Sequence, residues 1–442
     1  MLLRFAAENI LSFKDAVEFN TFPSSKSHSH EWHKMKCDYA TALRMSAIYG
    51  ANGAGKSNLL KCVALLKEMV GAEKIGDTSL RDDLFFKFNG SGNSRPSELA
   101  MEFFADGKIF YYHIVFKERK VVAEELLLSG RTHDKSIFSR KDNRIELSSE
   151  FINPKLSSTV VFIDGINRLI RPDILALSFF GHYYLKELPI VESAFDWFEK
   201  LQIVLPAMDI STLPFLLDRD RDFASLVNSV VPELNTGISR LTVEKELITE
   251  EESRKIPTLN SVLMAAKNCP GKPQIVKSPN GSTGNLVMEN GSFTLMTLSA
   301  VHESPAGKEV SLDLFEESDG TRRLVEYMPL LYSIIKNDSV YLIDEIERSI
   351  HPVLIKNIIS KISESKDAKG QLIFTTHESC LLDQSIFRPD EIWFTQKDVD
   401  QSTQLYPLSD YNIHKTANIE NGYLNGRYGG IPFLSNLTDL KW

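Results

Sequence analysis

The sequence has little cysteine, no long apolar run and fewer basic than acidic residues. Four cysteines in 442 residues are far apart and form no CxxC pair, which excludes a disulfide frame or a zinc site and indicates reduced thiols. Charged residues interrupt every apolar run before about 18 residues, so no transmembrane helix is expected. The N-terminus lacks the apolar core of a signal peptide. We therefore expect a cytoplasmic protein with no membrane partner.

The charge balance limits the choice of partners. Lys and Arg number 50 against 59 Asp and Glu, which gives a net charge of −9. A chain this acidic is not a generic nucleic-acid coat, although a local basic groove stays open. Its 43% hydrophobic and 25% charged content is ordinary for a globular protein. At this length we expect two or three lobes.

The most specific motif is the glycine-rich run Gly50–Ser57, which matches the phosphate-binding pattern G-x-x-x-x-G-K-[ST]. The apolar segment Met45–Tyr49 before it predicts a strand, and Asn58–Lys67 after it has apolar residues at helical spacing. In such a turn backbone N–H groups converge on phosphate oxygens, Lys56 reaches the β- and γ-phosphates, and Ser57 holds Mg²⁺. The predicted phosphate-contacting residues are Gly50, Asn52, Gly53, Ala54, Gly55, Lys56, Ser57 and Asn58.

A second motif supplies carboxylates. Val340–Ile343 is an apolar segment that predicts a buried strand, and Asp344 and Glu345 follow it directly. Asp344 would lie near Mg²⁺, and Glu345 would polarise the attacking water as a general base. The alternative is a strand that ends in a solvated acidic turn, and the phosphate loop at 50–57 favours the catalytic interpretation.

Two further elements complete the candidate site. Leu372–His377 predicts another buried strand, and His377 at its end would contact the γ-phosphate, whereas the alternative is a structural histidine. About 25 residues before the acidic strand, Ser318 and Gly320 precede a predicted helix. A small hydroxyl residue and a glycine at a helix start form an anion-binding geometry.

Three regions are predicted from the rest of the chain. Residues 1–150 contain strands, with segments at 2–5, 10–13 and 16–19 and hairpins at 99–116 and 136–147, and residues 21–40 form a Ser-, His- and Lys-rich loop. Residues 155–285 form a helical insertion whose aromatic stripe indicates packing, ending in a polar linker over 250–290 that is rich in Pro and Gly. Residues 286–442 return to regular structure.

With these motifs in this order, the chain resembles the head domain of ABC-type ATPases of the SMC/RecF-like branch. Within that branch it resembles the stand-alone AAA family ATPases of prokaryotic defence operons, RloA-like and OLD-like. The resemblance implies an α/β P-loop head, with a mixed sheet, helices and an antiparallel β lobe, interrupted by the helical insertion. It implies that Gly50–Ser57 is Walker A, Asp344 and Glu345 are Walker B, 318–323 is the ABC signature and His377 is the switch histidine. The shared segments are Glu317–Leu324, Asp344–Glu347, His351-Pro352, Thr375–His377, Ile392–Phe394 and Gly426–Phe433.

The sequence departs from the family pattern in three ways. The signature is Glu-Ser-Asp-Gly-Thr and not the Leu-Ser-Gly-Gly-Gln of transporters, which argues against a membrane-transport engine. The glutamine loop has no assigned position. Only 65 residues follow His377, too few for the Toprim nuclease domain of OLD proteins. Nuclease activity would therefore come from a partner.

The family mechanism implies that ATP and Mg²⁺ are held between two subunits of a homodimer or a ring-like oligomer. One subunit contributes the Walker residues and His377, and the other contributes Ser318 and Gly320. Arg322 and Arg323 either act as arginine fingers or pair with Glu316, Glu317 or the nearby surface. His351-Pro352 is either the partner-contacting D-loop or only a helix start, and His302 is expected to be structural.

Three functional hypotheses follow. The first is an ATPase whose nucleotide-dependent assembly senses a phage-protein or nucleic-acid trigger and controls a separately encoded toxic effector or nuclease in anti-phage defence. The second is a RecF/SMC-like DNA-binding ATPase in DNA repair, against which the acidic net charge and the lack of a coiled-coil heptad run argue. The third is a scaffold that binds ATP without turnover, which the presence of Glu345 disfavours.

Overall fold

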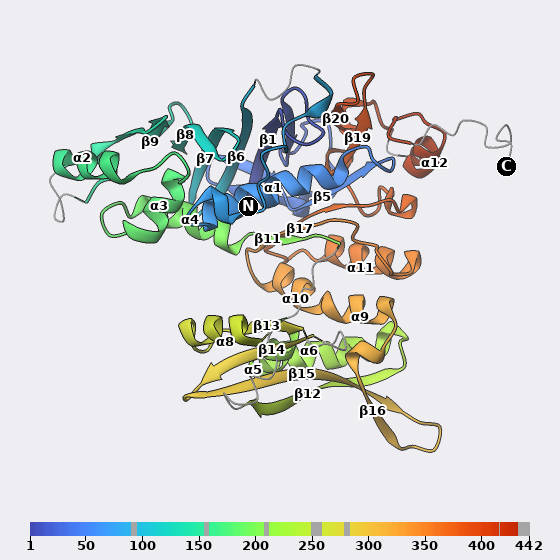
Figure 1. Ribbon diagram of the computed structural model, residues 1–442. Coiled ribbons are helices and arrows are strands. Elements are labelled where there is room, and N and C mark those ends of the chain that lie inside the picture. Colours follow the sequence, from blue (N-terminus) through green and yellow to red (C-terminus); the bar gives the residue numbers. More distant parts are fainter. Residues whose placement is uncertain are drawn as a thin grey trace, which may run out of the picture. The chain divides into compact units, whose positions relative to one another are not determined.

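The computed structural model describes residues 1–89, 95–153, 159–206, 212–248, 259–277, 283–414 and 416–431. The chain forms two compact units, each described by itself below (Figure 1). Unit 1 comprises residues 1–205, 337–346 and 359–442, and unit 2 comprises residues 206–336 and 347–358. No helix in the described ranges is long and apolar enough to cross a membrane. The fold class is α/β, as the sequence predicts.

The centre of unit 1 is a six-stranded sheet in the order β11-β17-β18-β5-β19-β20. β11, β17, β18, β5 and β19 run parallel, and only β20 is antiparallel to its neighbour. Every residue of β5, β17 and β18 is buried, because parallel strands of this kind are covered on both faces. The strands are β5 (Met45–Gly50), β11 (Gln202–Val204), β17 (Val340–Ile343), β18 (Gln371–Thr375), β19 (Ile392–Lys397) and β20 (Thr403–Pro407).

A seven-stranded antiparallel sheet forms the second layer of unit 1, in the order β10-β9-β8-β7-β6-β1-β2. Both predicted hairpins are confirmed, and the first turns at Asp106-Gly107, where both residues have positive φ. The predicted strand at 10–13 is wrong, since only an isolated bridge joins Ile10 and Phe13. The strands are β1 (Leu2–Glu8), β2 (Val17–Asn20), β6 (Ser97–Ala105), β7 (Lys108–Lys117), β8 (Lys120–Ser129), β9 (Lys135–Lys141) and β10 (Arg144–Leu147).

Helices cover this antiparallel sheet on its apolar face. Figure 1 shows α3 and α4 beside α1, and Phe103 of β6 stacks on Trp197 of α4 with ring centroids 4.3 Å apart. The aromatic stripe of the predicted insertion is therefore core packing, as expected. The helices of unit 1 here are α1 (Lys56–Gly71), α2 (Thr159–Leu169), α3 (Ala176–Tyr183) and α4 (Ile190–Lys200), and a small hairpin joins β3 (Lys34–Cys37) to β4 (Ala40–Leu43).

Unit 2 is built on a sheet in the order β12-β15-β14-β13, with β16 also paired to β15. The side chains of β15 pack into two separate apolar cores. Leu298 packs with residues of α5, α6 and α10, whereas Phe293 packs with residues of α8. The strands are β12 (Ile238–Ile248), β13 (Gln274–Lys277), β14 (Thr283–Glu289), β15 (Ser292–Glu303) and β16 (Glu309–Asp313). The helices are α5 (Leu213–Arg219), α6 (Arg221–Val230), α8 (Leu259–Asn268), α9 (Asp319–Glu326) and α10 (Met328–Lys336).

Two predictions about the middle of the chain need correction. The insertion predicted over 155–285 is divided, because α2, α3 and α4 belong to unit 1 and residues from 206 belong to unit 2. The linker predicted over 250–290 contains α8, β13 and β14, because Ala266 and Leu286 pack in a small apolar core. The many Pro and Gly residues had favoured a linker over this regular structure. Residues 249–258 and 278–282 of that linker lie outside the described residues.

Candidate nucleotide-binding site

The predicted phosphate loop connects β5 to α1. Gly50 ends β5, Asn52 and Gly53 are exposed at the tip, and Asn58 lies in the first turn of α1. Gly55 caps the helix in a left-handed conformation (φ 109°), and a Cβ there would lie 2.2 Å from the Thr403 hydroxyl oxygen. The helix start therefore presents backbone N–H groups that have no partner within the helix.

Thr403 of β20, which is not part of the phosphate loop, holds the loop by a hydrogen bond. Its hydroxyl donates to the carbonyl oxygen of Ala54 (2.9 Å), and Ala54 is itself buried. Thr403 was not predicted from the sequence, because it lies almost 350 residues beyond the loop and only the β19–β20 pairing brings it there.

Lys56 lies inside the loop and is 5% exposed. Its ammonium group donates to the Gly50 carbonyl oxygen (2.7 Å) and lies 3.4 Å from Nδ1 of His377. His377 is exposed directly beyond β18, as predicted. The structure thus brings the predicted lysine and histidine into contact although 321 residues separate them.

The carboxylate of Asp344 is held at the end of β17 by two hydroxyl groups. Ser57 donates to its Oδ1 atom at 3.1 Å, and Thr375 of β18 donates to the same atom at 2.5 Å. The Thr375 hydroxyl oxygen also accepts the backbone N–H of Glu345 (2.8 Å). Glu345 has a positive φ of 52° and is half-buried, whereas Asp344 is 1% exposed. Thr375 is thus a positioning residue that sequence analysis named only as part of a motif.

The donor set of this site suits the cofactors that the motif implies. A serine hydroxyl and a carboxylate are hard oxygen ligands of the kind that Mg²⁺ takes, usually with phosphate oxygens and water. The buried ammonium group of Lys56 bonds to carbonyl oxygens of Gly50 and Ala51 in its own loop and lies beside the His377 imidazole. A cation held at the start of a helix in this way fits an anion-binding role. Ser57 and Asp344 would hold Mg²⁺ beside the phosphates of ATP.

The predicted signature segment belongs to unit 2. Ser318 is the N-cap of α9, and its exposed side chain accepts the backbone N–H of Thr321 (3.2 Å). Gly320 lies against the carbonyl oxygen of Ser349, which a Cβ would approach to 2.5 Å. An exposed hydroxyl at a helix N-terminus is the predicted anion-binding geometry.

The two arginines after the signature have partners within unit 2. Arg322 pairs with Asp319 and stacks over Phe315 at 4.8 Å, and Arg323 lies 3.6 Å from Glu326. The alternative that predicted pairing with Glu316, Glu317 or the nearby surface is supported. The partners are Asp319 and Glu326 of that surface, because helical spacing places them nearer than Glu316 and Glu317.

Two histidines outside the site have local structural contacts. His302 lies 2.5 Å from Glu317, and it therefore braces the residue before the signature, in accord with the structural role expected for it. His351 directly precedes Pro352, where α11 (Pro352–Glu364) begins. The helix-start interpretation is thereby confirmed, and the partner contact of a D-loop stays a prediction.

Gly430, in the described part of the segment Gly426–Phe433, lies against the phosphate loop, a position that the sequence did not predict; residues 432 and 433 lie outside the described residues. At Gly430 (φ 67°) a Cβ would lie 3.7 Å from the Gly50 Cα atom. The Tyr423 hydroxyl donates to the Gly430 carbonyl oxygen (3.1 Å), and burial raises the pKa of Tyr423, which keeps this donor protonated. α12 (Ile419–Leu424) thus supports the strand end where the loop begins.

The same segment also reaches the residues after His377. The Ser379 hydroxyl donates to Glu420 of α12 at 2.8 Å, and Tyr423 stacks on Phe394 of β19 with ring centroids 5.6 Å apart. The C-terminal segment therefore connects the switch-histidine loop to the start of the phosphate loop.

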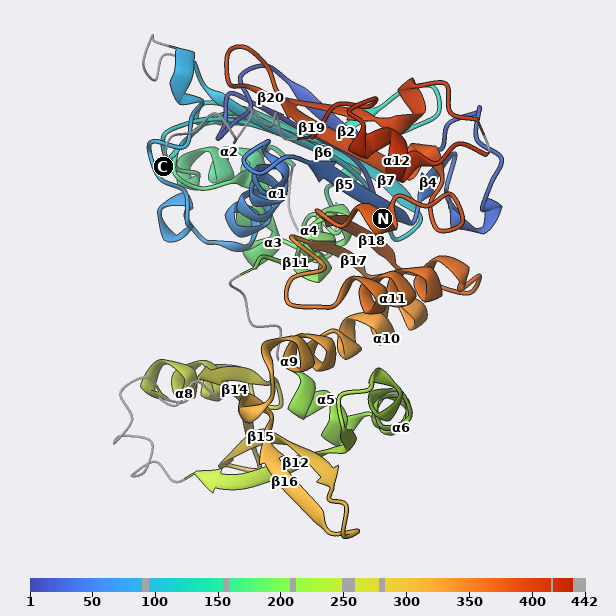
Figure 2. The same cartoon turned by 90° about the vertical axis from the view of Figure 1, so that its right-hand side faces the viewer.

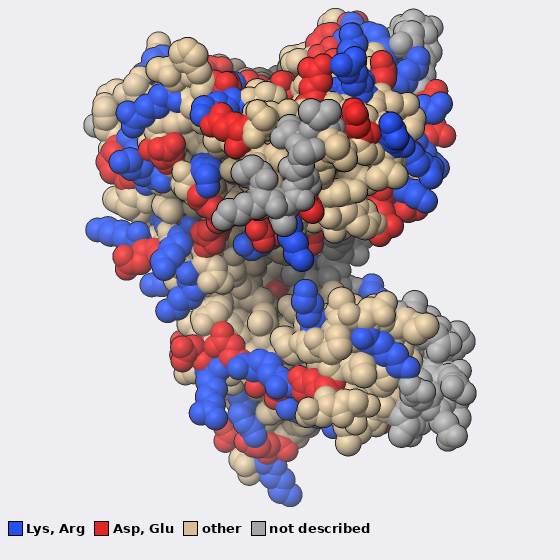
Figure 3. All heavy atoms as spheres, turned by 90° about the vertical axis from the view of Figure 1, so that its left-hand side faces the viewer, with Lys and Arg blue, Asp and Glu red and all other residues tan. Residues whose placement is uncertain are grey.

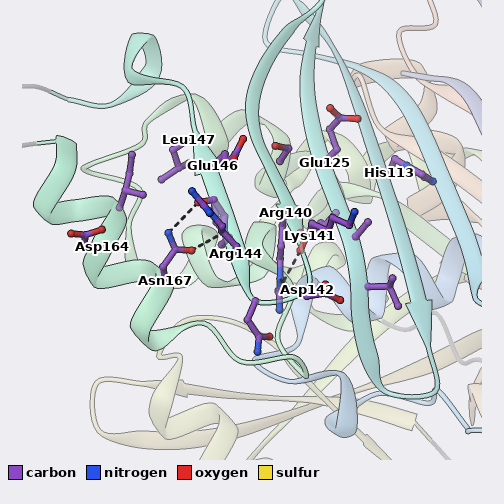
Figure 4. A pocket seen from close by; sticks show the side chains of 17 residues that line it. His113, Glu125, Arg140, Lys141, Asp142, Arg144, Glu146, Leu147, Asp164 and Asn167 are labelled. Atoms are coloured by element: carbon purple, nitrogen blue, oxygen red, sulfur yellow. Dashed lines mark hydrogen bonds and ion pairs between the residues drawn. The ribbon is translucent and has the colours of Figure 1, made fainter.

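A cavity of about 1320 Å³ lies elsewhere in unit 1, between β8, β9, β10 and α2 (Figure 4). Its buried charges have structural partners: Glu124 accepts the backbone N–H of Ala176 at 2.6 Å, and Arg140 donates to the Asp142 carbonyl oxygen at 2.6 Å. Burial raises the pKa of Glu124. Asn167 of α2 covers the edge of β10, so this network supports α3 and the sheet edge.

A phosphate loop, a strand-end Asp-Glu pair and a histidine just beyond a third strand lie on one mostly parallel sheet, an arrangement typical of P-loop nucleotide-binding domains. Residues 45–383 match the AAA_21 family, described as "AAA domain, putative AbiEii toxin, Type IV TA system". The chain belongs to this family, because the match spans more than half of it. No curated protein matches the sequence.

Solved structures of SMC head domains resemble the chain at low identity. The SMC head bound to the C-winged helix domain of ScpA has 16% identity and a TM-score of 0.45, covering 92% of this chain and 97% of that one. The SMC head domain from Thermotoga maritima has 13% identity and a TM-score of 0.38, covering 93% and 99%. An SMC head with an extended coiled coil, bound to the C-terminal domain of ScpA derived from Pyrococcus furiosus, has 15% identity and a TM-score of 0.39, covering 92% and 96%.

Replacing Thr375 by valine removes the hydroxyl that bonds Asp344 and the Glu345 backbone. We expect magnesium-dependent ATP affinity, measured by titration calorimetry, to fall by about tenfold, the effect of losing a buried hydrogen bond of about 1–2 kcal/mol. Thr375→Ser keeps the hydroxyl and should restore most of the affinity. Equal affinities for Thr375→Val and the wild type would show that the hydroxyl does not position the carboxylate.

Gly430→Ala places a methyl group at a left-handed position against Gly50 and Phe394. We expect it to weaken ATP binding several-fold, because relief of about 1–2 kcal/mol of backbone strain shifts the loop start. Gly426→Ala is the matched control, since Gly426 has a similar φ (77°) but its nearest neighbour is Ile431. If both variants bind ATP equally weakly, the effect comes from backbone strain alone and the support role is refuted.

Proposed function

We propose that this protein hydrolyses ATP and that nucleotide binding joins two or more copies into an assembly that senses a signal and controls a separate effector, in anti-phage defence. The observation that supports it most is the meeting of Lys56, Ser57, Asp344 and His377 at the ends of β5, β17 and β18. These residues are distant in sequence. If each had only a structural role, nothing would require all four to lie together at one edge of the sheet.

The residues have distinct roles in the proposed reaction. Lys56 binds β- and γ-phosphate oxygens, and Ser57 and Asp344 hold Mg²⁺, which neutralises phosphate charge when bound. Glu345 accepts a proton from the water that attacks the γ-phosphorus, while the bond from that phosphorus to the bridging oxygen breaks. His377 donates a hydrogen bond to the γ-phosphate and responds to its loss.

A second copy completes the proposed site. Ser318 is exposed, caps α9 and lies in a unit separate from the phosphate loop, which suits a hydroxyl that contacts the γ-phosphate on another subunit. Gly320 lies beside it, and its lack of a side chain lets the start of α9 pack against the Ser349 carbonyl oxygen. Hydrolysis removes the bridging charge, so the nucleotide state sets the assembly state.

The proposed role in defence rests on the resemblance and on the family name. The family is described as a putative toxin of a type IV toxin–antitoxin system, and membership of a two-component system supports a separately encoded partner. The trigger in this proposal is a phage protein or a nucleic acid, and the effector is encoded separately.

The DNA-repair alternative has weaker support. The net charge is −9, and the face drawn in Figure 3 has acidic and basic side chains interspersed on each unit. A DNA clamp requires a basic track whose binding falls steeply with salt. DNA-stimulated, salt-sensitive hydrolysis would favour this alternative over the effector model.

Glu345→Gln removes the proposed general base and keeps the side-chain shape. We expect steady-state phosphate release to fall by about a hundredfold or more, while ATP still binds and the assembled state accumulates. Phosphate-release kinetics and light scattering with ATP and Mg²⁺ measure the two effects. Undiminished turnover would refute the role of Glu345, and low turnover in the wild type would favour the scaffold hypothesis.

Ser318→Arg places a bulky cation at the proposed intersubunit contact. We expect hydrolysis to be lost, whereas ATP binding to the single subunit stays intact because Ser318 is far from the loop in sequence and exposed. Ser311→Arg, on exposed β16 of the same unit, is the control and should hydrolyse ATP normally. Normal turnover by Ser318→Arg would overturn the shared-site model.

A further inference from the structure

A second cavity of unit 1 lies between the loop after β2 and the segment after β20. It has a volume of about 500 Å³ and is lined by residues 24 and 26–29 on one wall and by residues 409 and 411–414 on the other, with Gln384 and Pro389. Figure 2 shows the dark-blue β4 region and the red α12 region on the same side of unit 1. The Ser- and His-rich loop predicted from the sequence forms one wall, and no step of the proposed ATP chemistry uses it.

Hydrogen bonds from side chains hold both walls in place. Arg388, which is fully buried, donates to the Ser27 carbonyl oxygen (3.1 Å), and Asp390 accepts from two nitrogen atoms of the same guanidinium group (2.9 and 2.8 Å). On the other wall Gln384 donates to the His414 carbonyl oxygen (3.2 Å). The cavity is therefore formed without a ligand, and the charge of Asp390 is already neutralised.

The polar side chains of this cavity include hydrogen-bond donors and the cation of Lys26. His28 and His414 bring imidazole nitrogens that can donate hydrogen bonds. Ser27, Tyr411 and other hydroxyl and amide groups complete the lining. No acidic side chain is among the described residues that line it, although the whole chain is acidic.

Two other cavities have a different lining. The cavity of Figure 4 includes Glu125, Glu146 and Asp164 beside its basic side chains, and a cavity of about 240 Å³ in unit 2 includes Asp319 and Glu326 beside its arginines. Carboxylates repel an anionic ligand, so those cavities suit one less well. Hydroxyl, amide and cationic donors without carboxylates suit the oxygens of a phosphate group, and about 500 Å³ is within the usual range for a small-molecule site.

We propose that this cavity, the Lys26–His414 pocket, binds a small phosphorylated ligand of nucleotide size, at a site separate from the phosphate loop. Lys26 and His414 bind the phosphate oxygens from opposite walls, and the hydroxyl and amide groups bind the remainder of the ligand.

The pocket has a physical connection to the ATP site. Gln384 lies in the segment after His377 and also donates to the Ala417 carbonyl oxygen (2.7 Å), just before α12. α12 leads to Gly430, which contacts Gly50. A ligand that moves the wall at 409–414 therefore changes the support of the phosphate loop; this coupling rests on the proposed ATPase function, whereas the binding does not.

Titration calorimetry on the full-length Lys56→Ala variant tests the binding, because that background weakens phosphate binding at the ATP site. The probes are inorganic pyrophosphate and adenosine 5′-monophosphate. We expect one of them to bind, and Lys26→Ala/His414→Ala in the same background to lower its affinity at least tenfold. The control is Lys36→Ala/His133→Ala, which removes an exposed lysine and histidine outside the pocket and should leave the affinity unchanged.

Three results would overturn the proposal: no binding of either probe, equal binding by the pocket and control variants, or binding only of a short 5′-phosphorylated RNA, which would assign the pocket to nucleic acid. Both double variants alter exposed residues, so their thermal unfolding should match that of the background protein. ATP turnover of the wild-type protein, measured separately, tests the proposed function independently of this binding.

Discussion

The candidate site depends on one constraint, the parallel pairing of β5, β17 and β18. Parallel strands end at the same edge of a sheet, so Gly50, Asp344 and Thr375 meet although they lie in three distant parts of the chain. The pairing also buries the Asp344 carboxylate. A buried charge is costly unless it is hydrogen-bonded, and the hydroxyl groups of Ser57 and Thr375 provide those bonds.

Segments that lie far from the phosphate loop in sequence also hold the site in place. Thr403 fixes the phosphate loop from β20, and Gly430 packs against its first residue. The chain after His377 therefore takes part in the site, through Ser379 and α12, and is more than a terminal extension. A site supported from several segments responds to changes in any of them, as the proposed nucleotide-gated assembly requires.

Much of this site could be predicted from local sequence. The run at 50–57 and the pair Asp344-Glu345 each carry their chemistry within a few residues, and apolar flanks predicted strands that the structure contains. The hairpin at Asp106-Gly107 was predictable for the same reason. By contrast, α8 and β13 were missed because their packing partners, not their own composition, stabilise them. The boundary near residue 205 was missed because it depends on strand pairing between β11 and β17.

The sequence by itself determined the nucleotide chemistry, since glycine, lysine, serine and carboxylate at these spacings have one well-known use. Only the tertiary structure decided that Thr375, Thr403 and Gly430 support that chemistry and that Arg322 and Arg323 are paired. It also decided that a pocket whose described lining residues include no carboxylate forms around Lys26 and His414. The reason is physical. Short-range motifs fix which atoms are available, whereas hydrogen bonds between residues hundreds of positions apart exist only after the strands have paired.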